Sequence, residues 1–88
     1  MDFRWNQWNI EHLAKHGVAP EEAEEVVRAA AGPYPRRIGD DQLLVWGPGR
    51  GGRLLQVIFV VDDEGTAFVI HGREWTNREK RLHLRMGR

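Results

Sequence analysis

The feature that most constrains the fold is a pair of apolar, β-branched runs separated by a short turn. Residues 53–61 include the uninterrupted stretch Val57-Ile58-Phe59-Val60-Val61, and residues 66–71 form the second run. The intervening Asp62-Asp63-Glu64-Gly65 is typical of a hairpin connection, in which Gly65 can take a positive φ. Because apolar residues occupy both faces of these runs, we expect them to be central strands of a sheet.

The residues before this hairpin have the pattern of two short helices. Asn6 or Asn9 can cap the first helix, and Gly17 can end it in a left-handed conformation. The second helix is expected to begin at Pro20, a residue tolerated in a first turn, and to end at Gly32.

Residues 34–38 and 42–46 are two further strand candidates, and the glycine-rich residues 47–52 are typical of a hairpin loop. A phosphate-binding loop is the alternative for 47–52, but the Lys-Ser/Thr ending of a P-loop is absent. The chain therefore predicts one α+β domain over residues 1–88. We expect N-terminal helices and a short C-terminal helix packed on an antiparallel sheet of about four to five strands.

The C-terminal segment is the basic part of a chain whose net charge is zero. Thr76 and Glu79 fit a capping box, which predicts a last helix from about residue 77 to 86 with Leu82, Leu84 and Met86 to bury. Residues 66–88 carry six basic and two acidic side chains, whereas residues 1–65 carry seven and eleven. Such an asymmetry can direct a polyanion to this segment, but composition alone favours a solvated C-terminal helix.

Other classes of protein are disfavoured by what the sequence lacks. The chain has no cysteine, which removes disulfides, thiolate zinc sites and cysteine nucleophiles. Its longest apolar stretch is far shorter than the ~20 residues of a membrane span, and its first residues lack the pattern of a signal peptide. We expect a cytoplasmic protein with no membrane partner.

Histidines and tryptophans each leave two interpretations open. His12 and His16 lie four residues apart on a predicted helix and could share a metal, but no third ligand is evident nearby. We therefore expect no metal and no cofactor. The aromatic side chains could stack on nucleobases, although filling a small core is their commoner use. They include four tryptophans, which are Trp5, Trp8, Trp46 and Trp75.

Residues 71–81 hold the densest set of chemically active side chains. Cleavage of RNA through the 2′-hydroxyl needs a base, an acid and cations that stabilise the phosphorane charge. His71 or Glu79 could exchange the protons. Three guanidiniums, those of Arg73, Arg78 and Arg81, could hold phosphate without a metal. The alternative is a strand end followed by a capped, solvated helix.

Several blocks of the chain resemble toxins of the BrnT family. They are residues 3–6 (Phe-Arg-Trp-Asn), 12–18 (His-Leu-Ala-Lys-His-Gly-Val), 21–23, 52–57, 70–73 and 76–81 (Thr-Asn-Arg-Glu-Lys-Arg), whereas residues 32–50 match poorly. The resemblance implies a RelE-like α+β fold and a metal-independent endoribonuclease toxin of a type II toxin–antitoxin system, which restrains translation. It also implies a cognate antitoxin protein, with a toxin–antitoxin hetero-oligomer or a homodimer as the assembly.

The resemblance also implies which residues form the site. Positions that match the family are Arg73, Thr76, Arg78, Glu79, Lys15, His16 and Arg53, whereas His71, Gly72 and Glu74 depart from its pattern. We expect a catalytic group of four residues, namely His71, Arg73, Arg78 and Glu79. The RNA is expected to contact Lys15, Arg53, Thr76 and Arg81. The alternative is a non-catalytic module of the same fold that binds a small protein through its basic C-terminal segment.

Overall fold

The computed structural model describes residues 1–86, with side chains described to residue 84. Its elements are β1 (Phe3–Arg4), α1 (Gln7–Ala14), α2 (Pro20–Arg28), β2 (Arg36–Arg37), β3 (Gln42–Pro48), the 3-10 turn η1 (Arg50–Gly52), β4 (Leu54–Val61), β5 (Ala67–Glu74) and α3 (Asn77–Met86). Three helices and a five-stranded sheet confirm the expected α+β class. No described helix is both long and apolar enough to cross a membrane.

The sheet has the strand order β1-β5-β4-β3-β2, so the predicted hairpin of β4 and β5 lies inside it. Neighbouring strands of the sheet run antiparallel to each other, with one exception. Strand β1 runs parallel to β5 and pairs with it only at Ala67 and Phe68. The expectation of a purely antiparallel sheet is thus wrong at this edge. Residues 5–66 separate β1 from β5 in the sequence, so no hairpin turn imposes an antiparallel direction on this pair.

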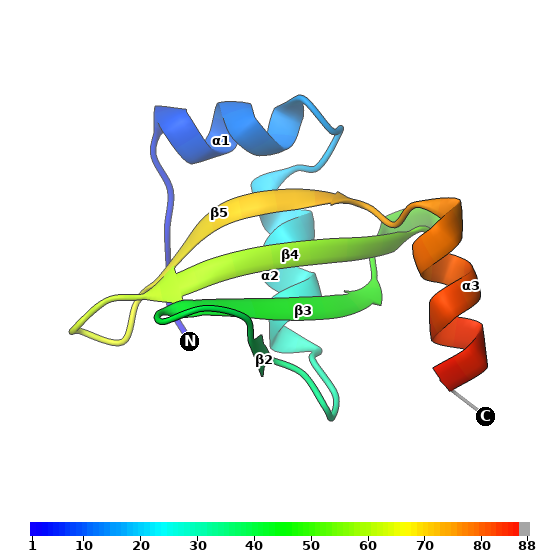
Figure 1. The fold of residues 1–88 in the computed structure, drawn as a ribbon. Helices are drawn as coiled ribbons and strands as arrows, with labels where there is room; N and C mark the ends of the chain where they lie inside the picture. Colours follow the sequence, from blue (N-terminus) through cyan, green and yellow to red (C-terminus); the bar gives the residue numbers. More distant parts are fainter. Residues whose placement is uncertain (87–88) are drawn as a thin grey trace.

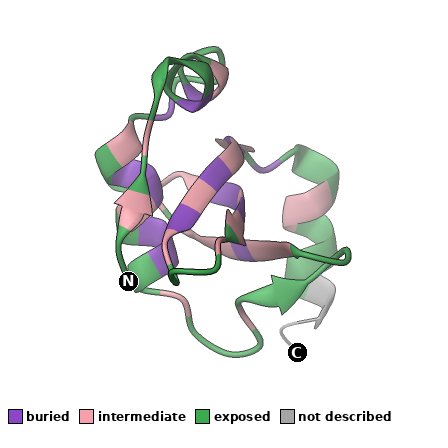
Figure 2. Ribbon diagram, turned by 90° about the vertical axis from the view of Figure 1, so that its left-hand side faces the viewer, coloured by how far each residue is buried: buried purple, intermediate pink, exposed green. Residues whose placement is uncertain are grey.

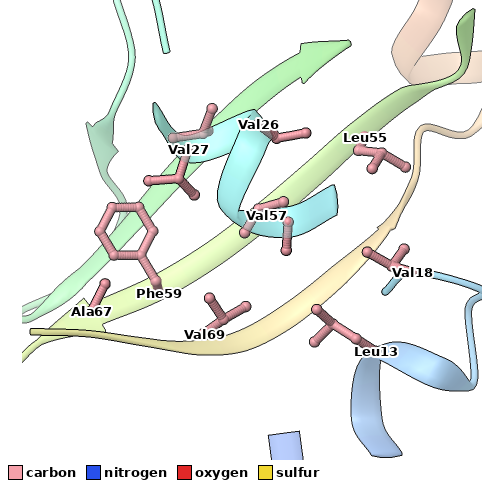
Figure 3. Close-up of a cluster of buried hydrophobic side chains, with 11 residues drawn as sticks. Leu13, Val18, Val26, Val27, Leu55, Val57, Phe59, Ala67 and Val69 are labelled. Carbon is pink, nitrogen blue, oxygen red and sulfur yellow. The ribbon is translucent and has the colours of Figure 1, made fainter. Parts of the chain in front are cut away.

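Helices α1 and α2 cover one side of the sheet, with α1 along β5 and α2 behind β3 and β4 (Figure 1). An aliphatic core that also contains Phe59 lies between these helices and the sheet (Figure 3). The other side of β3–β5, which we call the open face, is crossed by no described helix (Figure 1). Trp75 is buried outside the aliphatic core and the half-buried Trp5 packs against that core, so the expectation that the tryptophans fill the core holds only in part.

The helices begin where the sequence predicts, but α2 ends at Arg28 and not at Gly32 as expected. The Asn6 side chain accepts a hydrogen bond from the Asn9 amide, and the Asn9 side chain accepts one from the Asn6 amide, which makes a capping box at the start of α1. Pro20 opens α2. At α3, the Glu79 amide donates to Thr76 Oγ1 over 3.1 Å and the Thr76 amide donates to Glu79 Oε1 over 2.8 Å. This second capping box also matches its prediction.

Helix α3 docks differently from the prediction. Leu82 and Leu84 are 46% and 65% exposed, so the expectation that they are buried is wrong; the side chain of Met86 lies outside the described part. The helix leaves the end of the sheet instead of lying across it, and most of it is exposed (Figures 1 and 2). Its contacts include His83, whose ring centroid lies 4.9 Å from that of Trp75, and Glu79, which pairs with Arg73 of β5.

Candidate functional site

A bulge in β5 determines which way the candidate catalytic residues point. Phe59 pairs with Val69, but the preceding Ile58 pairs with His71, so Ile70 has no partner opposite it. Strict alternation from buried Val69 would turn His71 towards the core. The extra residue moves His71 and Arg73 to the open face, a common effect of bulges near functional sites.

The residue between these two faces the helices. A Cβ added to Gly72 would lie 3.0 Å from Leu13 Cγ, so the absence of a side chain lets α1 approach β5 closely. This contact brings the end of α1 to the strand that carries His71. The rings of His16 and His71 consequently lie 6.1 Å apart between centroids.

His71 has an environment that favours its neutral form. Burial lowers the pKa of its imidazole, and the neighbouring charges of Arg73 and His16 lower it further. Its Nε2 is buried and has no hydrogen-bond partner among the described side chains. The imidazole is therefore uncharged at neutral pH, and the fold does not use its Nε2.

Arg73 and Glu79 form a bidentate ion pair between the end of β5 and the first turn of α3. Arg73 Nη1 and Nη2 donate to the two carboxylate oxygens over 2.7 and 2.9 Å, and Nη1 also donates to the carbonyl oxygen of Glu74 over 3.0 Å. These bonds from Arg73, together with the Thr76 amide, lower the pKa of Glu79 to about 2. Glu79 is therefore ionised at neutral pH and holds Arg73 in one orientation.

Two aromatic side chains of α1, Trp8 and His12, extend the row of rings that includes His16. Trp8 and His12 stack with ring centroids 4.0 Å apart, and Trp8 also meets Phe68 of β5 edge-on at 6.0 Å. The spacing of four residues between His12 and His16 was the available sequence signal. Only the packing of α1 against β5, which the sequence does not reveal, places these rings beside His71. In the described part of the chain, no group of three or more potential ligands is placed to hold a metal ion.

Arg53, expected to contact RNA, instead joins the two helices to the β3–β4 connection. Its guanidinium pairs with Glu22 of α2 and donates to the Gly17 carbonyl over 2.7 Å. The Arg50 amide donates to the same carboxylate over 2.7 Å. Glu22 is buried, and its hydrogen bonds from Arg53 lower its pKa below the ordinary range. Sequence analysis missed this buried acid because its neighbours in α2 are also glutamates.

The remaining expected contacts fall into two groups. The Thr76 hydroxyl caps α3, whereas Arg78, Arg81 and Lys15 are exposed. In the described residues, the ion pairs of the first 65 residues occupy four arginines, namely Arg4, Arg28, Arg50 and Arg53. The exposed cations that flank His71 and Arg73 along the chain are therefore those of α3.

Comparison with known protein families, curated proteins and solved structures finds no match to this chain. The resemblance to BrnT toxins accordingly depends on the sequence blocks alone.

Proposed function

We propose that this chain is a BrnT-like toxin of a toxin–antitoxin system, a metal-independent endoribonuclease that cleaves RNA through the 2′-hydroxyl and so inhibits translation. One observation supports this most: the neutral imidazole of His71 lies beside Arg73 on the open face, with the His16 ring 6.1 Å away. These groups are a base, a phosphate-binding cation and a second imidazole, which is the set that the reaction requires.

The chemical step follows from these groups. His71 takes the proton of the 2′-hydroxyl, and the 2′-oxygen attacks the adjacent phosphorus. The bond from phosphorus to the 5′-oxygen breaks while His16 supplies the proton that this oxygen needs. The products are a 2′,3′-cyclic phosphate and a free 5′-hydroxyl. Arg73 stabilises the negative charge that develops on the phosphoryl oxygens.

Glu79 has a positioning role in this mechanism. Its low pKa makes it a poor proton donor and a weak base, so it does not replace His71. It holds Arg73 in place before RNA binds. Arg78, Arg81 and Lys15 contribute attraction for the RNA backbone, which weakens as salt is added.

The test is expression and RNA cleavage with matched variants. Wild type is expected to slow growth and to cleave RNA, whereas His71→Gln and Arg73→Ala each reduce cleavage about a hundred- to ten-thousand-fold. Arg37→Ala, which alters an exposed arginine of the distant β2, is the control and keeps full activity. Thermal melts establish that each variant is folded. A wild type that neither cleaves RNA nor slows growth contradicts the proposal.

A second candidate function is a non-catalytic module that binds a small acidic partner. Exposed apolar side chains favour it, because Trp8 and Ile10 of α1 are 48% and 40% exposed, and Leu82 and Leu84 of α3 are exposed as well. This candidate predicts stable binding of a partner such as an antitoxin, or self-association, and no nuclease activity in the free protein. RNA cleavage by the free protein therefore separates the two functions.

A further inference from the structure

An aromatic cavity of about 430 Å³ opens at the edge of β3, outside the site around His71. Strand β2 pairs with β3 only at Leu43 and Leu44, so residues 45–48 keep a free edge in the described structure. The end of α2 and the chain that follows it form one wall, and the start of α3 forms another. This volume is within the range of pockets that hold small organic ligands.

Aromatic rings dominate the lining of this cavity. Trp46 and Trp75 lie 4.5 Å apart between ring centroids, and Tyr34 is nearly parallel to Trp46, at 29° and 6.4 Å. Both indole N–H groups are already bound inside the protein, to Gln56 Oε1 over 2.9 Å and to the Leu55 carbonyl over 2.8 Å. A ligand therefore meets ring faces, chiefly those of the half-buried Tyr34 and Trp46 because Trp75 is itself buried, and not hydrogen-bond donors, which suits stacking.

The charges around the cavity select the kind of aromatic ligand. The residues that line it include Arg36 and His83 but no aspartate or glutamate. An aromatic cage for a cation is thereby disfavoured, because such a site gains from nearby negative charge. A planar ring attached to an anionic group fits better, since the ring can stack while Arg36 meets the anion.

The cavity is aligned with the site on the open face. Trp46 pairs with Gln56 of β4, and Gln56 pairs with Arg73 of β5, so the three residues form one row across the sheet. Two strand spacings separate Trp46 from Arg73, which is about 10 Å. A single strand of RNA held at Arg73 can therefore place a flanking nucleotide at this cavity.

We propose that the cavity formed by Tyr34, Trp46 and Trp75 binds a nucleobase of single-stranded RNA, with Arg36 on the attached phosphate. The inference deepens the proposed function, on which it rests, by adding a subsite that gives the nuclease a preference for the base next to the cleaved bond. Stacking tolerates every base, so this preference is graded and does not exclude any base.

Binding can be measured without any cleavage, by following the four indole N–H signals of the ¹⁵N-labelled full-length chain during titration with nucleoside monophosphates. The signals of Trp46 and Trp75 are expected to move and saturate. Trp5, whose indole donates to Glu24 and which does not line the cavity, serves as the internal reference. Tyr34→Ala is expected to weaken binding about tenfold or more, because each stacked base contributes substantially to affinity. Arg36→Gln is expected to weaken binding of nucleotides but not of nucleosides.

Two controls and the cleavage assay decide the result. Inorganic phosphate alone is expected to leave Trp46 and Trp75 unmoved. Absence of shifts with every nucleotide overturns the inference, as does equal or tighter binding of N-acetyltryptophanamide, which would identify a protein side chain as the occupant. If nucleotides bind but the protein cleaves no RNA, the proposed nuclease fails while the base site stands. If RNA is cleaved without shifts at Trp46, the base site fails alone.

Discussion

At the scale of single residues, the hydrogen bonds around Glu79 bear on whether it positions Arg73 or transfers a proton. Its carboxylate accepts hydrogen bonds from both terminal nitrogens of Arg73 and from the Thr76 amide. A glutamate at such a site can either transfer protons or hold another side chain in position. The pKa of about 2 favours positioning, because the protonated form is almost absent near neutral pH.

The substitution Glu79→Gln tests this assignment through both stability and cleavage. We expect the free energy of unfolding at pH 7 to fall by about 2 kcal/mol, because charge-assisted hydrogen bonds are lost. Cleavage is expected to stay within about tenfold of wild type, whereas loss of a proton-transfer group would reduce it at least about a hundredfold.

The pH dependence of unfolding is an independent check on Glu79. Its folded-state pKa is lower than its unfolded value of 4.5, so its stabilisation is complete above pH 4.5 and declines as the pH falls towards about 2. Urea unfolding of wild type and Glu79→Gln is expected to differ most above pH 4.5 and to converge under acid. A difference that persists unchanged at pH 2 would contradict the assignment.

At the scale of elements, α2 and the β3–β4 connection are joined by one buried carboxylate. Glu22 binds the Arg53 side chain and the Arg50 amide, and a Cβ added to Gly49 would lie 2.6 Å from Glu22 Oε2. Glu25, in the same helix, pairs with Arg50 in an exposed position. The two glutamates therefore differ in burial while sharing helix, charge and type of partner.

This pair gives a prediction with a matched control. Glu22→Gln is expected to lower the free energy of unfolding by about 3 kcal/mol, because it leaves Arg53 partly buried without its counter-ion. Glu25→Gln is expected to leave it almost unchanged, as for other exposed ion pairs. Chemical denaturation measures both. Equal effects of the two substitutions would mean that Glu22 does not join these elements.

The elements also differ in how far the sequence predicts them. Local signals identified the capping box of Thr76 and Glu79, Asn6 as a candidate N-cap of α1, the start of α2 at Pro20 and the turn at Gly65, whose φ is +81°. The bulge at Ile70 has no such signal, because it depends on the register between β4 and β5. For the same reason the orientation of His71 and its approach to His16 were not predictable, since they arise from packing between distant segments.

At the scale of the whole molecule, the zero net charge conceals an uneven distribution of basic residues along the chain. In the described part of the chain, four of the seven basic residues in the first 65 form ion pairs, whereas Lys15, Arg36 and Arg37 form none. The sequence predicts the basic C-terminal segment, in which Arg73 pairs with Glu79 while Arg78 and Arg81 are exposed. Under the proposed function, RNA approaches the end of the open face next to α3 and the end of α1, and not the side of the sheet that α2 covers.

The most direct test of the central claim is the chemistry of the cleaved ends. Purified wild type is incubated in EDTA with an RNA and with the same strand carrying a 2′-deoxy nucleotide at the cleavage position. The account predicts that the RNA yields a 2′,3′-cyclic phosphate and a 5′-hydroxyl, and that the deoxy substitution blocks cleavage there. Loss of activity in EDTA, cleavage at the deoxy position, or an intact RNA would contradict it.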